Sequence, residues 1–435
     1  MTTGEIEPRP WKRAILWIAF LGPFFFASYG FANWLASRRA YVPIVAFAWE
    51  RAIPFVPWTI VPYWSIDLLY GLSLLLCTTR RELDRHALRL FVVQVISVAF
   101  FIALPLQFSF GRPAAGGIFG ALFTALGSFD KPFNQAPSLH IALLVVIWTR
   151  LAAHCPARWR WPLHGWMILI GVSVLTTYQH HFIDIPTGLL VGLATLWAVP
   201  DEGASPLGHI VIARDTRRGR LALFYGVGAG AFAAFACLGG AWLWLFWPSI
   251  ALVLVALSYA AIGERAFQKM SNGRLSAGAT GLLAPYLAGA WISSRIWTRR
   301  HARYAEVIDG VSIGRIPSAG DLAASKLAAV VDLSAELPCG RHWGPYYRSI
   351  PVLDLTVPTR EILRAAAEAI EDGREHGPVL VCCALGFSRS AAAVAAWLLL
   401  TGRAATVDAA MDLVRRARPA IVLRSDHRAA LEALL

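Results

Sequence analysis

One stretch decides the fold of the C-terminal part of the chain: Val379-Leu380-Val381-Cys382-Cys383-Ala384-Leu385-Gly386-Phe387-Ser388-Arg389-Ser390. Its first residues are apolar and β-prone, which predicts a buried strand, and the Ala-rich run that follows to about Leu400 predicts a helix. A tight loop therefore joins the strand to the helix. The backbone N–H groups of such a loop and the N-terminus of the helix converge on one point, so the sequence predicts an anion-binding site there.

Three residues of this loop suit the binding and the chemistry of a phosphate group. Gly386 permits the turn and lets the backbone approach a phosphate closely. Arg389 can bind two phosphate oxygens with its planar guanidinium. Cys383 lies where the same positive field stabilises a thiolate, which is the nucleophilic form of cysteine. A bare Cys-x5-Arg spacing also fits a buried cysteine pair beside a surface arginine, but the strand, the glycine and the following helix favour the phosphate site.

The pattern Cys-x5-Arg-Ser resembles the signature of the cysteine-dependent protein tyrosine phosphatase superfamily, and of its dual-specificity branch in particular, over roughly residues 306–435. The resemblance implies Cys383 as the nucleophile, Arg389 as the phosphate clamp, and Ser390 as a hydroxyl that helps the thiolate to leave the phosphocysteine. This family usually has histidine directly before the nucleophile, whereas this chain has Cys382. The residues expected to surround the phosphate are Ala384, Leu385, Gly386, Phe387, Ser388 and Arg389.

A phosphatase of this type needs an acid that protonates the departing oxygen. Asp354 ends an expected strand upstream of Cys383, which is where the dual-specificity branch keeps its acid. Asp332 lies within an expected strand and Asp372 on a surface helix, so both fit this role less well. Asp354 is therefore the expected general acid, and a plain turn-forming role at the end of the strand is the alternative.

The composition is that of a multi-pass membrane protein. The chain has 435 residues, of which 57% are hydrophobic and only 15% are charged, and several apolar runs are long enough to cross a bilayer. The net charge is +13, but the basic residues lie mostly in short loops between apolar runs, as the positive-inside rule expects. Because no basic stripe is interleaved with exposed aromatic residues, this charge does not predict nucleic-acid binding.

The cysteines indicate the compartment. The chain has six, and their spacing fits neither a disulfide framework nor a zinc site, so no metal and no cofactor is expected. A thiolate enzyme works best in a reducing compartment, which predicts a cytoplasmic C-terminal domain. The expected location is a bacterial-type inner (plasma) membrane, with the lipid bilayer around the apolar part of the chain.

Residues 1–200 are expected to form a helical membrane domain. The arginine-rich loop 78–89 predicts the inner side of the membrane, and the segments 37–57 and 107–137 are expected outside. Asp67 falls inside the second span, where an acid is functional by default, although pairing with a nearby tyrosine is the alternative. The six expected spans are at about 14–35, 59–77, 90–106, 139–153, 162–178 and 183–200.

Residues 201–302 are expected to contain an inner loop, a helical hairpin and an interfacial helix. The run 221–263 is too long for one crossing, which indicates two spans. The run 275–297 has basic residues at both ends, so a helix at the inner interface is favoured over a span. Residues 303–435 have the composition of a soluble α/β domain. Its expected strands are 311–316, 328–333, 349–353 and 379–381, and its expected helices are 359–375, 390–400, 406–418 and 427–435.

A second group of candidate catalytic residues lies in the membrane domain. Pro137-Ser138-Leu139-His140 begins the fourth expected span, and His180-His181-Phe182-Ile183-Asp184 lies between the fifth and the sixth. Two antiparallel spans separate His140 from His180, which places both on the outer face. At helical spacing Asp184 can orient the imidazole of His180 for attack, and His140 can act as an acid or a base. Two histidines that merely cap helix ends are the alternative.

The patterns Pro-Ser-x-His and His-x-x-x-Asp, within roughly residues 90–200, resemble the type-2 phosphatidic acid phosphatase superfamily. The resemblance implies a six-helix lipid-phosphatase-like core without a metal. It also implies His180 as the nucleophile, Asp184 as its orienting group and His140 as the proton donor to the leaving alcohol.

Most phosphate-binding cations of that family are replaced in this chain. Arg112 matches the arginine of the first motif and is the expected phosphate-binding residue of this site. Pro105 stands where the lysine of that motif is expected, and Val174 stands where the third motif has its arginine. This pattern is more similar to the branch that contains sphingomyelin and inositol-phosphorylceramide synthases, which move a phospho-headgroup between lipids.

The sequence thus predicts a membrane-bound phosphatase with a cysteine-dependent site on the cytoplasmic side and a His/His/Asp site on the outer face. Its expected substrate is a phosphorylated lipid or a phosphoprotein. The main alternative is a protein tyrosine or dual-specificity phosphatase in signalling, with the membrane part as an inert anchor. A lipid transporter is a third class, and only Asp67 favours it.

Overall fold

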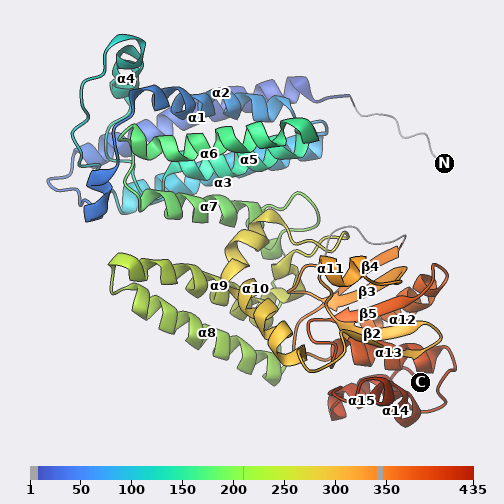
Figure 1. The fold of residues 1–435 in the computed structure, drawn as a ribbon. Coiled ribbons are helices and arrows are strands. Elements are labelled where there is room, and N and C mark those ends of the chain that lie inside the picture. The colour runs from blue at the N-terminus through green and yellow to red at the C-terminus, as the bar shows by residue number, and fades with distance from the viewer. Residues whose placement is uncertain (1–7, 209, 340–345) are drawn as a thin grey trace. The chain divides into compact units, whose positions relative to one another are not determined.

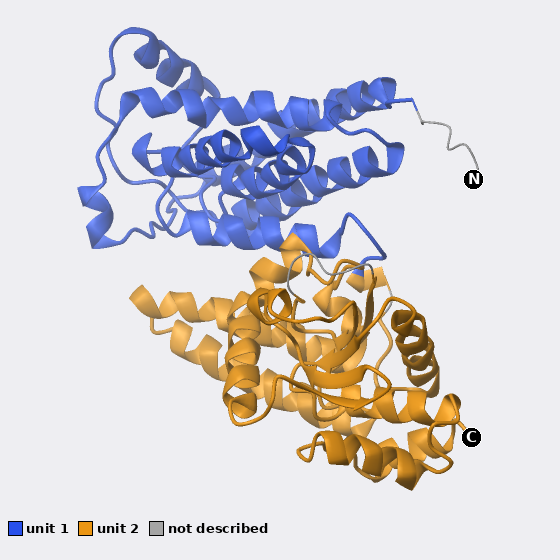
Figure 2. Cartoon of the chain, turned by 45° about the vertical axis from the view of Figure 1, so that its right-hand side comes forward, with its two compact units in different colours: residues 1–205 blue, residues 206–435 orange. Residues whose placement is uncertain are grey.

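The chain folds as two compact units, residues 1–205 and residues 206–435 (Figure 2). The computed structural model describes residues 8–208, 210–339 and 346–435. The first unit is helical, and the second combines helices with a five-stranded mixed sheet (Figure 1). This is the order that the sequence predicts from the change of composition near residue 303.

Six α-helices of the first unit lie where the sequence predicts spans, and another lies in a segment that is expected to be a loop. That helix, α4, has Phe123 and Leu126 buried in the core of the unit, so packing outweighs the low helix propensity of its glycines. The segment 107–137 is therefore not a plain loop. The helices are α1 (Trp11–Ser37), α2 (Ile60–Leu75), α3 (Arg80–Ala103), α4 (Gly117–Phe129), α5 (Leu139–His154), α6 (Arg160–Thr176) and α7 (Asp184–Ala198).

Helices α5 and α7 approach closely because α7 carries glycines on the face that meets α5. A Cβ atom on Gly188 would lie 2.6 Å from the carbonyl oxygen of Ser138, and one on Gly192 would lie 2.7 Å from the Cβ atom of Val145. Small residues one turn apart let two helix backbones pack against each other. The contact holds the first turns of both helices together, and the Ser138 N–H donates to the carbonyl oxygen of Asp184 at 3.1 Å.

Buried arginines join the other ends of α3, α5 and α7. Arg150 of α5 donates to Glu82 of α3, and it lies 2.6 Å from the carboxylate of Asp201, beyond the end of α7. Arg89 of α3 lies 3.0 Å from the same carboxylate of Asp201. Since a buried charge is tolerated only when it is paired, these ion pairs fix the three helices relative to one another.

Four segments of the described chain are long and apolar enough to cross a membrane. They are Trp11–Ser37, Arg80–Ala103, Thr216–Ala236 and Gly240–Phe267. The first and third bury little of their surface, and on the third the large apolar side chains of Leu223, Phe224 and Val227 are exposed. Such apolar surface is typical of helices that lie in lipid.

The second unit begins with helices and continues into the sheet. The hairpin expected in residues 221–263 consists of α8 (Thr216–Ala236) and α9 (Phe246–Leu257), and α10 (Ala277–Thr298) follows. The strands are β1 (Tyr304–Ile308), β2 (Val311–Arg315), β3 (Ala329–Ser334), β4 (Tyr346–Val352) and β5 (Val379–Cys383). The remaining helices are α11 (Ala319–Ala323), α12 (Arg360–Arg374), α13 (Arg389–Leu400), α14 (Val407–Ala417) and α15 (Ser425–Glu432).

The sheet has the strand order β1-β2-β5-β3-β4, with β1 antiparallel to β2 and all other neighbours parallel. Four of these strands are predicted by the sequence, and β1 is not. That strand is short, lies at the edge and is only partly buried, so it lacks the apolar run that marks the inner strands. The central position of β5 places its C-terminal end beside those of β2 and β3.

The pleat of β5 divides its side chains between two hydrophobic clusters. Val379, Val381 and Cys383 belong to the cluster formed with α12, α13 and α14, whereas Leu380 and Cys382 face the other side of the sheet. Part of the cluster on that other side is contributed by α10, whose Ala290 packs against it. The sheet is therefore covered by α12 and α13 on one face and by α10 on the other.

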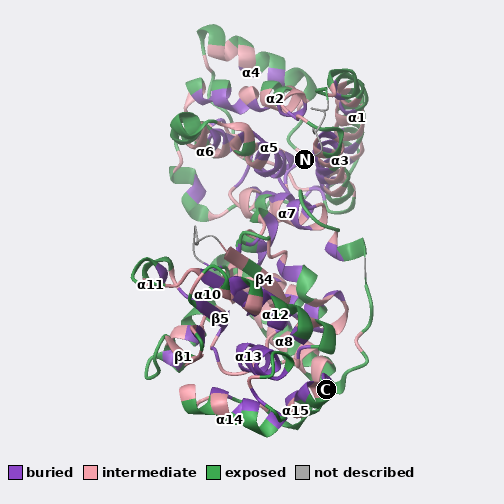
Figure 3. Cartoon of the chain, turned by 90° about the vertical axis from the view of Figure 1, so that its right-hand side faces the viewer, coloured by how far each residue is buried: buried purple, intermediate pink, exposed green. Residues whose placement is uncertain are grey.

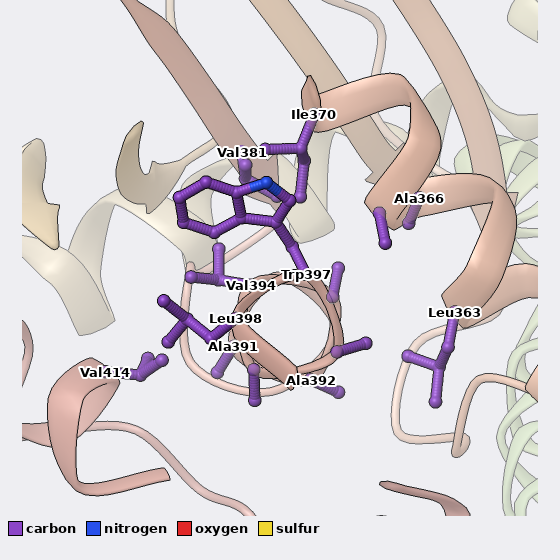
Figure 4. Packing of buried hydrophobic residues seen from close by; sticks show 14 of the residues in the cluster. Leu363, Ala366, Ile370, Val381, Ala391, Ala392, Val394, Trp397, Leu398 and Val414 are labelled. Atoms are coloured by element: carbon purple, nitrogen blue, oxygen red, sulfur yellow. The ribbon is translucent and has the colours of Figure 1, made fainter. Parts of the chain in front are cut away.

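Helix α13 is buried almost throughout, as Figure 3 shows, because small residues cover most of its surface. Figure 4 shows Ala391 and Ala392 of α13, the large indole of Trp397 near Val381 of β5, and Ile370 of α12. The Trp397 indole N–H donates to the Glu371 carboxylate at 2.7 Å, which satisfies its one polar group. The alanines let α13 lie close to the sheet, and this fixes the start of the helix next to the end of β5.

A buried ion pair anchors the segment before α10 to the sheet. The Lys269 Nζ atom lies 2.6 Å from Oδ2 of Asp332 on β3, and neither side chain is exposed. Lys269 also donates to the carbonyl oxygens of Ser334 and Leu337, at 2.6 and 2.8 Å, and the Tyr347 hydroxyl donates to Asp332 at 2.9 Å. Although the sequence separates residues 201–302 from 303–435, residues 206–435 thus form one compact unit.

The Lys269–Asp332 pair yields a stability prediction. Lys269→Met should destabilise the second unit by roughly 3–5 kcal/mol, because it leaves the Asp332 carboxylate buried without its cation. Urea unfolding of the full chain in detergent micelles, followed by alkylation of the buried Cys382 thiol, measures this loss. The double variant Lys269→Met/Asp332→Asn should recover much of the stability, since it removes the unpaired charge.

A matched control uses an exposed ion pair on α14. Arg415→Met breaks the contact of Arg415 with Asp412, and it should change the free energy of unfolding by less than about 1 kcal/mol. If the Lys269→Met single variant were as stable as the parent, or if the double variant were no more stable than the single one, the ion pair would not be the anchor.

Candidate active site

The loop between β5 and α13 has the geometry of an anion cradle. Gly386 has a positive φ of 74°, and a Cβ atom there would lie 2.4 Å from the carbonyl carbon of Gly314 on β2. Only glycine fits this position, because of both the backbone conformation and the close approach. The Ile316 N–H donates to the Cys383 carbonyl oxygen at 2.7 Å and holds the end of β5 against β2. The loop is thus fixed at the C-terminal edge of the sheet.

The thiol of Cys383 lies at the centre of this loop. Its Sγ atom accepts a hydrogen bond from the Gly386 N–H at 3.2 Å and lies 3.3 Å from the Ser390 hydroxyl. The side chain is buried, and α13 begins directly behind it. A backbone donor, a hydroxyl and a helix N-terminus therefore surround the sulfur, and all three suit a negatively charged sulfur atom.

Arg389 is held in place by acceptors from β3 and β4. Its guanidinium donates to both oxygens of Glu336, at 2.7 and 2.8 Å, and to the Val352 carbonyl oxygen at 2.7 Å. It also donates to Oδ1 of Asp354 at 2.9 Å. The fork of the guanidinium is thus oriented before any phosphate is present, which lowers the cost of ordering it on binding.

Both members of the Arg389–Glu336 pair are charged. Burial opposes the charge on each, but the Coulomb attraction between them outweighs it, which raises the pKa of Arg389 well above its usual range and lowers the pKa of Glu336. Glu336 is not among the residues expected from the sequence. Its signal is its place after β3, because parallel strands that are neighbours end at the same edge of a sheet.

Asp354 lies in the turn after β4, next to the clamp. Its side chain is 37% exposed, whereas the Arg389 side chain is only 2% exposed. Burial and the nearby Glu336 raise the pKa of Asp354, and Arg389 counteracts them in part. The structure therefore brings Asp354 to the loop of Cys383, while Asp332 is taken up by the anchor to Lys269.

Cys382 points away from the loop. It lies in the cluster on the α10 side of the sheet, where burial raises the pKa of its thiol well above the usual range and the Asp332 carboxylate adds to the effect. The residue that stands in place of the family's histidine is thus a neutral apolar group on the opposite face from Cys383.

Two residues from the C-terminal segment support the loop from outside. His427 Nε2 lies 2.8 Å from the Ser388 hydroxyl, and Arg418 donates to the Leu385 carbonyl oxygen at 3.1 Å. The Arg418 guanidinium also lies over the ring of Phe387. Neither residue is expected from the sequence, because no local pattern marks a contact between residues so far apart in the chain.

In the first unit, His180 is held at both ring nitrogens. Nδ1 lies 3.1 Å from Oδ2 of Asp184, and Nε2 lies 3.1 Å from the Ser138 hydroxyl. The expectation that His180 and Asp184 share one helix is wrong, because α7 begins at Asp184 and His180 lies in the turn before it. The contact forms nevertheless, and the His181 N–H also donates to Asp184 at 3.0 Å.

His140 reaches the same place from the first turn of α5. Its ring stacks on Tyr63 at 4.3 Å between centroids, and it lines a cavity of about 70 Å³ together with His180. The carboxylates of Asp67 and Asp130 line this cavity too. The described residues that line it include no lysine or arginine.

Arg112 does not join this group. Its guanidinium donates to the carbonyl oxygens of Thr177 and Tyr178, both at 3.2 Å, and lies over the ring of Phe123. The guanidinium that is expected to bind phosphate is therefore hydrogen-bonded to backbone carbonyl oxygens in this structure. The first unit brings together His140, His180 and Asp184, but not Arg112.

Comparison with known proteins assigns the C-terminal part of the second unit to a family. Residues 317–434 match the family model for the dual specificity phosphatase catalytic domain. The structure of Tk-PTP in the active form is 28% identical, with 30% of this chain and 95% of that chain covered and a TM-score of 0.28. A mouse putative dual specificity phosphatase complexed with zinc tungstate is also 28% identical, with 30% and 86% covered and a TM-score of 0.28. Human DUSP28 is 23% identical, with 31% and 93% covered and a TM-score of 0.28.

No curated protein matches the chain. The helices of the first unit are not assigned to a family, so a fusion with a lipid phosphatase domain is not shown. The family match and the loop geometry agree on the C-terminal part. Residues 317–434 are a dual-specificity phosphatase catalytic domain.

Proposed function

We propose that the C-terminal domain hydrolyses a phosphomonoester through Cys383. The observation that carries this proposal is the arrangement of the Cys383 sulfur, the Gly386 N–H and the Ser390 hydroxyl at the start of α13. The phosphate would lie in the loop 384–389, where backbone N–H groups and Arg389 face its oxygens. A membrane-embedded chain with its catalytic domain on the cytoplasmic side is part of the proposal, and the apolar segments support it.

The reaction would take place in two steps. The Cys383 thiolate attacks phosphorus and the bond to the leaving oxygen breaks, while Asp354 donates its proton to that oxygen. Water then attacks the phosphocysteine, Asp354 takes up a proton from it, and the sulfur leaves as a thiolate. The Ser390 hydroxyl, at 3.3 Å, can donate to the departing sulfur.

Arg389 and Asp354 would change partners during this cycle. Glu336 holds one side of the guanidinium, whereas the Nη2 atom is shared with the more exposed Asp354. A phosphate dianion can take the place of Asp354 at Nη2, because it carries more charge than the carboxylate. The raised pKa of Asp354 suits an acid that must hold a proton until the leaving group departs.

Variants of the two neighbouring cysteines test the nucleophile. Cys383→Ser should reduce hydrolysis of an aryl phosphate by several orders of magnitude, because a hydroxyl in this position is a far weaker nucleophile. Cys382→Ala is the matched control and should keep most of the activity, since that thiol lies on the other face of the sheet. Both effects are measured as steady-state rates of hydrolysis by the full chain, in which His180→Ala removes any contribution of the first unit. Near-normal turnover by Cys383→Ser would overturn the mechanism.

The pH profile tests the general acid. Asp354 is active when protonated, so kcat should fall on the alkaline side as pH rises through its raised pKa. Asp354→Asn should lower kcat for an alkyl phosphate by roughly 10²–10⁴-fold and remove the alkaline limb. Asp372→Asn, on the exposed face of α12, should leave the profile unchanged. An Asp354→Asn profile that keeps the alkaline limb would assign the acid to another residue.

We further propose that the first unit acts on a lipid phosphodiester, or passes a phospho-headgroup to a second alcohol, through His180. The contacts of His180 with Asp184 and Ser138, and the shared cavity with His140, favour this. The carboxylates in the cavity and the engaged Arg112 disfavour a doubly charged phosphomonoester, since each lost contact to a charged group costs about 1.5–3 kcal/mol. An inert membrane anchor is the alternative.

A comparison of labelled lipids tests the His180 site in the Cys383→Ser protein. A labelled phospholipid with an acceptor lipid should react faster than labelled phosphatidic acid, and His180→Ala should abolish the reaction. His181→Ala is the control, because its ring lies against Glu50 and outside the cavity with His140. Fast hydrolysis of phosphatidic acid would contradict the transferase proposal. If His180→Ala and its parent reacted with the lipids at the same rate, the first unit would be an anchor without catalytic activity.

A further inference from the structure

A cavity of about 380 Å³ adjoins the loop of Cys383 within the second unit. Its lining includes Ala384 and Leu385 of the loop and the acids Glu336 and Asp354. The lining also includes residues of α8, α9 and α10, the helices that precede the catalytic domain in the sequence (Figure 1). Its volume is in the range of small-molecule sites, about 300–1,000 Å³. The helices are therefore a wall of the active site.

Hydrogen bonds fix this wall to the catalytic residues. The Ser294 hydroxyl of α10 donates to the carbonyl oxygen of Ala384 in the loop at 2.6 Å. The Tyr259 hydroxyl, from the segment after α9, donates to the carbonyl oxygen of Asp354 at 3.0 Å. The helices thus contact both the phosphate loop and the turn that carries the expected acid. Their position next to the loop is built into the fold of the unit.

The lining of the cavity combines two acids with apolar side chains. The charged residues that line it, among those described, are Glu336 and Asp354, and both lie against Arg389. The apolar part of the lining includes Phe232 of α8 and Leu252 of α9. Arg389 itself does not line the cavity, so the anionic group of an occupant would lie beside the cavity, in the loop 384–389, and the cavity would hold the apolar body.

The walls do not suit a peptide chain. A bound peptide needs partners for its backbone N–H and C=O groups, and these groups cost free energy when they are buried unpaired. The backbone groups of α8, α9 and α10 are already bonded within their helices, so the wall offers no strand edge to pair with. A lipid has no such backbone, and its apolar part loses no hydrogen bonds in this cavity.

The helices that form the wall also have the features of a membrane boundary. Two segments, Thr216–Ala236 and Gly240–Phe267, are long and apolar enough to cross a bilayer. On α10 the exposed Trp291 lies under the guanidinium of Arg295, and the exposed Trp297 follows. Tryptophan and arginine at the end of an apolar helix are typical of the membrane–water interface. These features favour an occupant that comes from a bilayer.

We propose that the substrate of the Cys383 site is a membrane lipid that bears a terminal phosphomonoester. Its phosphate occupies the loop 384–389, and the apolar part next to the headgroup lies against α8, α9 and α10. This inference rests on the proposed hydrolysis through Cys383 and adds the substrate class to it. A phosphoprotein is the other outcome that the test distinguishes.

Gly289 provides a way to fill the cavity. It lies on α10 and lines the cavity, and a Cβ atom there would have no heavy atom within 4 Å. Gly289→Leu therefore adds a side chain to the lining at a position where its Cβ atom meets no neighbouring atom, and leucine favours the helix over glycine. Gly230→Leu is the matched control, because Gly230 is exposed on α8, also has open space around it, and does not line the cavity.

The experiment uses the full chain with His180→Ala, reconstituted in phosphatidylcholine vesicles. The vesicles contain in turn phosphatidic acid, phosphatidylglycerol phosphate or a phosphatidylinositol monophosphate, and an aryl phosphate and a phosphotyrosine peptide are the soluble probes. At least one lipid should be hydrolysed with a higher kcat/KM than the peptide. Gly289→Leu should lower kcat/KM for that lipid about tenfold more than for the aryl phosphate, the scale of losing the burial of roughly two methylene groups. Gly230→Leu should change neither value.

Each other outcome overturns a defined part of the argument. Hydrolysis of the peptide but of none of the lipids would overturn the lipid proposal and favour a phosphoprotein. Equal effects of Gly289→Leu on lipid and aryl phosphate, repeated with the smaller Gly289→Ala, would show that the wall does not contact the lipid. Absence of Cys383-dependent hydrolysis of the aryl phosphate would instead refute the proposed function itself.

Discussion

The buried guanidinium of Arg389 is the charge on which the arrangement of the catalytic domain depends. Taking an unpaired charge out of water costs several kcal/mol, so the fold must bring anionic partners to it. Glu336 comes from the end of β3, and the Val352 carbonyl oxygen and Asp354 come from the end of β4. The strand order β5-β3-β4 delivers these groups to one edge, because parallel neighbours end on the same side of a sheet.

The same pairing prepares the site for a phosphate. Glu336 is buried and binds the guanidinium with both oxygens, so it orients the fork permanently. Asp354 is partly exposed and shares only one nitrogen, so it can be displaced without leaving a buried charge unpaired. In the proposed mechanism Glu336 thus positions the arginine, and Asp354 takes part in the reaction. Glu336 and Asp354 are both acids, and it is the difference in their burial that distinguishes the two proposed roles.

The sequence predicts those parts of the structure that have a local cause. The apolar run, Gly386 and the Ala-rich run predict β5, the loop and α13, and the long apolar runs predict the helices of the first unit. Glu336, Arg418 and His427 contact the loop from distant elements, and α4 and β1 depend on packing against the rest of their units, so no local pattern reveals them. For Arg112 a local pattern exists but misleads: the residue matches a phosphate-binding motif, yet its guanidinium donates to backbone carbonyl groups instead of joining the His180 site.

The Lys269 anchor and the Ser294 hydrogen bond hold the apolar helices and the catalytic sheet together in one compact unit. With those helices in a bilayer, the phosphate loop keeps a constant height and tilt above the lipid surface. The proposed lipid substrate would then reach the enzyme by lateral diffusion in two dimensions. The relevant concentration would then be the number of substrate molecules per unit area of membrane, so dilution of the substrate by other lipids would slow the reaction even when its total amount in the cell is constant.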